Sequence, residues 1–197
     1  MALGTDSQRP MLKGAMIQSV RALMIERGTI DRVRGALPKD WAHALDGDVF
    51  TTDWIDLRVM GAIGYAVAQT SSDAAVTEIV RTVSRTGTIP RIQPIIDGIV
   101  RLFGLTPASI FARMSTINRA TTRGVETEWV PSGSNAGSVF LRFDGPVDPP
   151  SPWSLCSPPS IAAWMGTIHA VFDICDLKGT VTPMPVRDRR IELRAQW

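Results

Sequence analysis

The sequence predicts an α+β domain with a helical N-terminal half and a C-terminal half built as hairpin, helix and hairpin. Two observations support this fold class. Apolar residues recur every three or four positions over residues 11–123, which is typical of amphipathic helices. From residue 124 onward, apolar and polar residues mostly alternate, which is typical of half-buried strands. We therefore expect a four-stranded, mainly antiparallel sheet that packs on a helix over residues 158–176, with both halves forming one compact unit.

The helical half is expected to follow a flexible tail of residues 1–10. A first helix should begin near Met11 and end at Gly28, because glycine is common just beyond the ends of helices. A second, short helix should begin at its N-cap Thr29. Pro38 limits this helix because proline does not continue a helix.

From Trp54 the apolar pattern is helical again, and the next helix begins at the capping signal "SSDAAV". The segment "TGTIPRIQP" is expected to interrupt the helices, because glycine and proline are the strongest local breakers. One more helix then leads to a last one, "TPASIFARMSTINRA", which has Thr106 as its cap. These elements complete a helical subdomain over residues 11–123.

The C-terminal subdomain, residues 124–197, should begin with a hairpin whose strands are joined by a longer loop at "PSGSNAG". A proline-rich connection leads to the 158–176 helix. The chain then closes with a second hairpin, in which Ile191, Leu193 and Ala195 share one face. The prolines of its first strand restrict that strand to an edge of the sheet.

The segment "CSPPSIAAWMGTIHAVFDIC" contains both cysteines of the chain and one of its two histidines. A helix places Cys175 on an apolar stripe with Trp164, Ile168 and Phe172, which favours a buried, unreactive thiol. A disulfide with Cys156 is disfavoured, because about 16 helical residues span roughly 24 Å. Bridged cysteines have Cα atoms within about 7 Å of each other.

A metal site on this helix is disfavoured as well. His169 and Cys175 are six positions apart, whereas two ligands on one helix need a spacing of three or four. Asp173 lies one turn after His169, so we expect either a surface pair or a hydrogen-bonded histidine at the core boundary. His43 is expected on an exposed short turn. We therefore predict no catalytic, cofactor-binding or metal-binding residues, and no zinc.

Composition and motifs argue against several other functions. The net charge is only +2, and no nucleic-acid recognition motif is present, so nucleic acid is an unlikely partner. A phosphate-binding loop and a nucleophile elbow are both missing, which argues against an enzyme. The chain shows no secretory signal and no apolar run of about 18 residues, so we expect a cytoplasmic protein that does not enter the membrane.

Charge is distributed unevenly along the chain. The region over residues 81–123 is rich in arginine, and the region over residues 40–56 is acidic. Such asymmetry suggests a surface for an acidic partner, either a second copy of the chain or another protein. The alternative is a set of solvated helix faces that form no single patch. The candidate surface residues are Arg81, Arg85, Arg91, Arg101, Arg113, Arg119 and Arg123, with Asp46, Asp48, Asp53 and Asp56. The same aspartates also suit loops and helix caps, and Asp53 in particular suits the N-cap of the helix from Trp54.

The segments "LKGAMIQSVRALMIERG", "TTDWIDL" and "ELRAQW" resemble a large paralogous family of uncharacterised myxobacterial proteins of about this length. That family is similar in outline to heme-nitric-oxide-binding domains and to vinyl-reductase-type ligand-binding domains. The resemblance implies helices packed against an antiparallel sheet, and a role in ligand sensing or association.

The residues that hold heme in such domains have no counterpart here. The resemblance requires an axial histidine in the middle helices, and residues 57–123 contain none. It also requires a Tyr-X-Ser-X-Arg strand motif, whereas the single tyrosine, Tyr65, is followed by "AVAQ". The closing hairpin lacks the cysteine of the vinyl-reductase type. The expected protein is therefore heme-free.

These observations lead to one main functional hypothesis and one alternative. The first is a non-enzymatic, regulatory module for sensing or protein interaction. The alternative is a domain that binds a small apolar ligand in a pocket between the helices and the sheet.

Overall fold

The computed structural model describes residues 9–144, 151–186 and 190–197. The helices are α1 (Gly14–Glu26), α2 (Ile30–Ala36), the 3-10 helix η1 (Lys39–Leu45), α3 (Arg58–Thr70), α4 (Asp73–Val83), the π-helical turn η2 (Ser84–Thr88), α5 (Ile89–Phe103), α6 (Pro107–Phe111), α7 (Met114–Thr121) and α8 (Pro158–Ile174). The strands are β1 (Met11–Lys13), β2 (Trp54–Asp56), β3 (Thr122–Arg123), β4 (Val125–Gly133), β5 (Ala136–Phe143), β6 (Thr180–Pro183) and β7 (Arg190–Gln196).

The C-terminal half confirms the predicted α+β class. Strands β4, β5, β7 and β6 lie in that order in one sheet, and every neighbouring pair is antiparallel. Ile191, Leu193 and Ala195 of β7 are buried, as their alternation predicted. Strand β6, which contains Pro183, lies at the edge, where a missing backbone donor is tolerated.

The first hairpin closes more tightly than predicted. Gly133 pairs with Ala136, so Ser134 and Asn135 alone form the turn, and the longer loop expected at this point was wrong. The expected tail of residues 1–10 lies mostly outside the described residues, and so do residues 187–189 of the predicted second hairpin.

A small second sheet was not predicted. Its strand order is β2-β1-β3, so the start of the helical half pairs with residues from two distant parts of the chain. The helix expected from Met11 therefore begins only at Gly14, and the helix expected from Trp54 begins at Arg58. Asp53 consequently caps no helix, because the residues after it form β2.

The predicted interruption at "TGTIPRIQP" was wrong, since α4 continues through η2 into α5. Pro90 lies in the first turn of α5 and Pro94 lies inside this helix, which directly follows the π-helical turn η2. The capping signal predicted in "SSDAAV" is confirmed, since the Ser72 side chain accepts a hydrogen bond from Ala75 N. The helix predicted from Thr106 is divided into α6 and α7, although its N-cap is confirmed.

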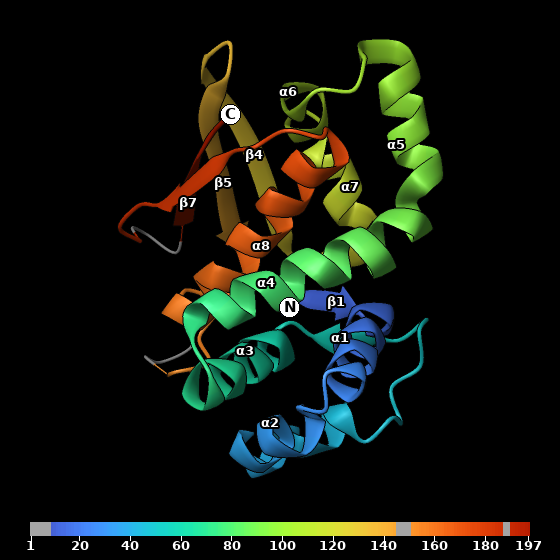
Figure 1. Cartoon of the computed structure of the whole chain (residues 1–197), viewed down its shortest axis with the longest axis vertical. Coiled ribbons are helices and arrows are strands. Elements are labelled where there is room, and N and C mark those ends of the chain that lie inside the picture. Colours follow the sequence, from blue (N-terminus) through green and yellow to red (C-terminus); the bar gives the residue numbers. More distant parts are fainter. Residues whose placement is uncertain (1–8, 145–150, 187–189) are drawn as a thin grey trace, which may run out of the picture.

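Helix α4 crosses the middle of the molecule, with α1, α2 and α3 on one side and α8 with the sheet on the other (Figure 1). Helix α8 packs closely on α4 at Gly166. A Cβ atom added at this glycine would overlap the carbonyl oxygen of Thr77. The Thr77 hydroxyl donates a hydrogen bond to the carbonyl oxygen of Ala162 across this contact, at 3.1 Å. Helices α5, α6 and α7 extend beyond α4 on the α8 side (Figure 1).

Candidate functional site

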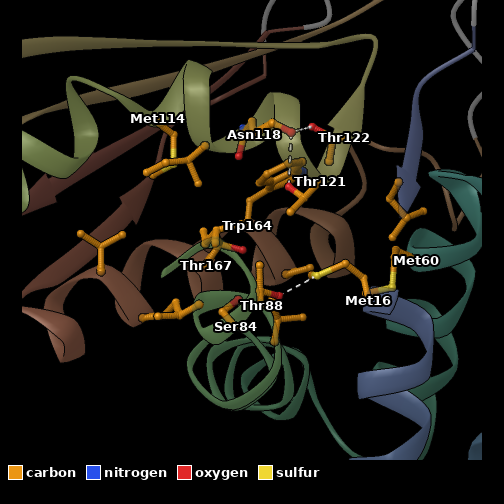
Figure 2. A pocket seen from close by; sticks show the side chains of 18 of the residues that line it. Met16, Met60, Ser84, Thr88, Met114, Asn118, Thr121, Thr122, Trp164 and Thr167 are labelled. Carbon is orange, nitrogen blue, oxygen red and sulfur yellow. Dashed lines mark hydrogen bonds between the residues drawn. The ribbon is translucent and has the colours of Figure 1, made fainter. Parts of the chain in front are cut away.

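A cavity of about 120 Å³ lies where the two halves of the molecule meet. Its walls come from β1 and α1, the start of α3, the α4–η2–α5 segment, α6 and α7, and α8. The lining is mostly aliphatic, with the thioethers of Met16, Met60 and Met114 and the indole of Trp164. In Figure 2 these side chains surround the cavity from α1, α3, α7 and α8. The site therefore depends on residues from both halves.

Hydroxyl groups also line the cavity, and several are already engaged by the protein. The Thr88 hydroxyl donates to the Met16 sulfur at 2.7 Å, which joins η2 to α1. The hydroxyls of Thr121 and Thr122 donate to the backbone carbonyl oxygen of Asn118 at 3.3 and 3.0 Å. These bonds appear as dashed lines in Figure 2. The two bonds to the Asn118 carbonyl oxygen lie at the end of α7.

Asn118 is the most unusual residue of the lining. Its side chain is 5% exposed, yet its amide nitrogen Nδ2 has no hydrogen-bond partner among the described residues. It lies on the same face of α7 as Met114, Ile117 and Thr121, at helical spacing. Sequence reasoning missed this residue. The available signal was an amide side chain within an apolar helical stripe.

The two cysteines are free thiols near the two ends of α8, and each is only partly buried. The expectation that Cys175 is a buried core residue was therefore too strong. Burial raises the pKa of Cys175 to about 11 and also raises the pKa of Cys156. Both side chains are consequently neutral thiols at pH 7, which are poor nucleophiles and poor metal ligands.

His169 lies edge-on to the Phe172 ring, with 5.9 Å between ring centroids. Burial lowers its pKa, and the nearby charge of Arg81 acts in the same direction, although Asp173 and Glu78 oppose both effects. The Asp173 carboxylate, which the sequence placed near His169, forms hydrogen bonds with Arg81. His43 is exposed on η1, as predicted. No cluster of three or more potential metal ligands occurs within the described residues.

Four of the seven candidate arginines contact other parts of the chain: Arg81, Arg91, Arg113 and Arg123. Arg81 binds the Asp173 carboxylate, and Arg91 donates to the Ala15 carbonyl oxygen and the Ser19 hydroxyl. The guanidinium groups of Arg113 and Arg123 lie over the Phe103 ring at 4.3 Å and the Trp54 ring at 3.9 Å. The other three, Arg85, Arg101 and Arg119, are exposed on η2, α5 and α7. The candidate set thus includes both structural and exposed guanidinium groups.

Three of the four candidate aspartates have partners close by in the sequence. Asp46 forms an ion pair with Arg34 at 2.6 Å, and Asp56 binds Arg58. Asp53 accepts a hydrogen bond from the backbone N–H of Phe50 at 2.9 Å, and Asp48 is exposed. Asp46 and Asp56 are therefore already balanced by arginines of their own half.

Comparisons with known proteins establish the fold alone. No protein-family profile and no curated protein matches the chain. Solved structures of H-NOX (heme-nitric-oxide-binding) proteins match at low sequence identity. An H-NOX protein from S. oneidensis in the Fe(II)NO state is 12% identical, with a TM-score of 0.65, over 94% of this chain and 98% of that one. One from K. algicida, unliganded with Fe(II), is 8% identical, with a TM-score of 0.64, over 94% and 96%. A mutant H-NOX protein from T. tengcongensis is 13% identical, with a TM-score of 0.61, over 94% and 97%.

These neighbours raise the question of heme, since one of the similar structures concerns heme distortion in the H-NOX family. The residues around the cavity do not fit that group. The lining contains no histidine, cysteine or tyrosine among the described residues, and these are the usual proximal ligands of heme iron. The volume of about 120 Å³ is also well below the roughly 300–1,000 Å³ of sites for drug-sized ligands. The chain therefore has the fold of these neighbours, but the described residues that line this cavity do not fit heme.

Proposed function

We propose that this chain is a heme-free, non-enzymatic sensory domain that binds a small apolar molecule in its central cavity. The observation that carries the proposal is the apolar cavity of about 120 Å³, whose walls come from both halves of the molecule. The H-NOX neighbours support a sensory role through their shared fold, and the expectation of a regulatory module from the sequence agrees with it.

The size and polarity of the cavity suit a small ligand. Apolar cavities of about 150 Å³ in proteins remain dry and bind benzene or xenon. The lining here offers thioether, aliphatic and indole surface, and no charged side chain among the described residues. An apolar molecule gains free energy on leaving water for such a lining. Acid–base or nucleophilic chemistry has no residue to carry it here, which supports binding without turnover.

The position of the cavity suggests how binding could act as a signal. Helix α1 with η2 and helices α7 and α8 all contribute walls, and the Thr88–Met16 hydrogen bond crosses one side of the cavity. A ligand shifts a conformational equilibrium only if it binds one arrangement better than another. A molecule that contacts walls from both halves binds one arrangement better than another if the distance between the halves differs between the two arrangements.

A titration of isotopically labelled protein with benzene tests this function. The methyl groups of Met16, Met60 and Met114 line the cavity, whereas those of Met24 and Met165 do not. We expect ¹³C-methyl NMR shifts at the first three residues only. The variant Ala170→Leu fills the cavity from α8 and should abolish the shifts. Ala120→Leu makes the same change on the exposed side of α7 and should preserve them. Shifts at all methionines alike, or at none, would contradict the proposal.

We also retain the protein-interaction function as a second candidate. Leu102, Phe103 and Leu105 are exposed at and just beyond the end of α5, beside the exposed Arg101. Apolar side chains next to positive charge suit an acidic partner protein with an apolar centre. Cytoplasmic association is then expected to weaken as salt rises, because exposed charges are screened over about 8 Å at physiological salt.

The pair Arg101→Glu and Arg119→Glu tests this second candidate. We expect the double variant to lose partners captured by the wild-type chain at low salt. Lys178→Glu reverses one positive charge outside the candidate residues and should leave capture unchanged. Equal capture by all three proteins would remove the arginine-rich region from consideration.

A further inference from the structure

We infer that the cavity selects a neutral ligand with a hydrogen-bond donor on an apolar body about the size of one six-membered ring, and that the Asn118 side-chain oxygen Oδ1 accepts this donor. The inference rests on the function proposed above and adds the chemical class of the ligand to it. Small alcohols and phenols belong to this class.

The first reason is the orientation of the Asn118 amide. Asn118 belongs to the cavity lining and is 5% exposed. Its nitrogen Nδ2 is enclosed by protein, whereas its oxygen Oδ1 is the amide atom that reaches open space. In Figure 2 a side-chain oxygen of Asn118 lies on the side of α7 that faces α8 across the cavity. The amide therefore presents an acceptor, and not a donor, to a ligand.

The second reason is that this oxygen has no partner. The hydroxyls of Thr121 and Thr122 both donate to the backbone oxygen of Asn118, and no donor among the described residues reaches the side-chain oxygen. Buried polar groups in proteins are almost always hydrogen-bonded, because an unpaired group loses its water without compensation. A hydroxyl group on a ligand would supply the missing bond, while the rest of the ligand fills the apolar volume.

The other polar groups of the lining do not discriminate between ligands in the same way. Ser84 and Thr167 add hydroxyls from η2 and α8. A hydroxyl group both donates and accepts, so it binds either kind of ligand group. The asparagine oxygen only accepts. The preference for a ligand that donates therefore comes from Asn118.

The third reason concerns charge and size. No aspartate or glutamate lines the cavity in the part of the chain that the structure describes, so an ammonium group would be buried without a counter-charge. The donor is therefore a neutral one. The volume of about 120 Å³ is close to the roughly 150 Å³ of a cavity that binds benzene, so the cavity has room for one ring but not for a long chain.

The test uses two molecules of nearly the same shape, phenol and toluene, which differ by OH against CH₃. Dissociation constants are measured with the full chain from the ¹³C-methyl shift of Met114, which lies one turn from Asn118. The ratio of the two constants cancels the contribution of the ring. Comparing this ratio between variants also cancels the hydration of the two probes, so it isolates the contact between the hydroxyl and the amide oxygen.

We expect the ratio to shift against phenol about fivefold in Asn118→Leu, because leucine has nearly the shape of asparagine without its acceptor. Asn135→Leu makes the same change at an exposed position of the β4–β5 turn and should leave the ratio unchanged. An unchanged ratio in Asn118→Leu would overturn the inference while leaving the proposed function intact. The same holds if Ser84→Ala or Thr167→Val shifts the ratio and Asn118→Leu does not. Failure of both probes to bind the wild-type chain would overturn the proposed function, and the inference with it.

A second pair of probes distinguishes an acceptor from a donor at Asn118. Pyridine and benzene have the same shape, and neutral pyridine carries an acceptor without a donor. The ratio of their dissociation constants should be the same in Asn118→Leu and in the wild type. If Asn118→Leu weakens pyridine relative to benzene and leaves the phenol ratio unchanged, the amide donates to the ligand and the inference is wrong.

A further measurement needs no variant, so it does not depend on the folding of Asn118→Leu. The ¹³Cγ resonance of Asn118 should move downfield when phenol binds, because a hydrogen bond to a carbonyl oxygen deshields its carbon. Toluene should not produce this shift. If phenol binds and the resonance does not move, the hydroxyl is held elsewhere and the inference is wrong.

Discussion

Arg81 of α4 and Asp173 of α8 form a two-point ion pair, with Nε–Oδ2 and Nη2–Oδ1 distances of 2.7 and 2.5 Å. The pair joins the two helices at the centre of the molecule, near the contact at Gly166. Asp173 is 15% exposed and Arg81 is 41% exposed, so the bond is partly screened by water. The main role of Arg81 is therefore to stabilise the fold, and a role in an interaction surface is secondary.

Asp173→Asn should lower the free energy of unfolding by about 1–2 kcal/mol, because it removes a charge-assisted bond at a half-exposed site. Arg81→Lys should retain only part of the stability that the pair provides, since lysine lacks the planar fork that binds both carboxylate oxygens. Urea unfolding measures both changes. If Asp173→Asn unfolds at the same urea concentration as the wild type, the pair contributes nothing to stability.

The pH dependence of stability should show two separate contributions. Hydrogen bonds from Arg81 lower the pKa of Asp173, so this contribution is complete above the ordinary value near 3.9 and disappears as pH falls through the lower folded-state pKa. Burial lowers the pKa of His169, so the unfolded chain binds its proton first. Stability should therefore begin to fall as pH drops below about 6.5.

His169→Gln isolates the second contribution. The melting temperature of this variant should fall less than that of the wild type when the pH is lowered from 7 to 5. Both proteins should lose stability at lower pH, where Asp173 becomes protonated. If the stability of the wild type instead increases as the pH is lowered from 7 to 5, the pKa of His169 is raised in the folded state.

The purified chain should contain neither heme nor zinc. The cavity lining offers no proximal heme ligand among the described residues, and Cys175 and Cys156 remain protonated at neutral pH. We expect no Soret band after expression with added heme precursor, and less than stoichiometric zinc by elemental analysis. A Soret band that remains after gel filtration would require a heme site that the cavity does not provide.

Trp164→Ala should lower stability and enlarge the cavity. Trp164 packs against Phe143 with 6.3 Å between ring centroids, and it is only partly buried. We expect a loss of about 2–3 kcal/mol, less than the 3–5 kcal/mol of a fully buried large side chain. The enlarged cavity should also accept a two-ring molecule such as naphthalene, which the wild type rejects. Urea unfolding and the methionine-methyl titration measure the two effects, and an unchanged stability would mean that the indole is not part of the core.

Periodicity and capping predicted the parts of the fold that local sequence determines. Ser72 and Thr106 begin helices as expected, and the alternation ending in Ala195 predicted the closing strand. Segments of two or three residues such as β1 and β3 carry no such signal, because their pairing depends on distant chain segments. The continuity through "TGTIPRIQP" was missed because proline generally breaks helices, whereas α5 has Pro90 in its first turn and Pro94 inside it.

The candidate site was harder to predict than the fold. A pocket between helices and sheet was an open alternative, but its residues come from segments as distant as Leu12 and Ile174. Asn118 gave a faint signal, a polar residue on an apolar stripe. Only the packing of α7 shows that its amide is buried without a partner. The arginine cluster had a clear sequence signal, yet Arg81 and Arg91 are held by contacts within the chain.

A crystal pressurised with xenon tests the central claim most directly, because xenon binds small dry apolar cavities. The account predicts a xenon atom between α7 and α8, in contact with Met114, Ile117 and Trp164, and its loss in Ala170→Leu. Crystals in which xenon binds elsewhere but leaves this cavity empty, or filled with ordered water, would contradict the proposal that the chain binds a small apolar molecule at this site.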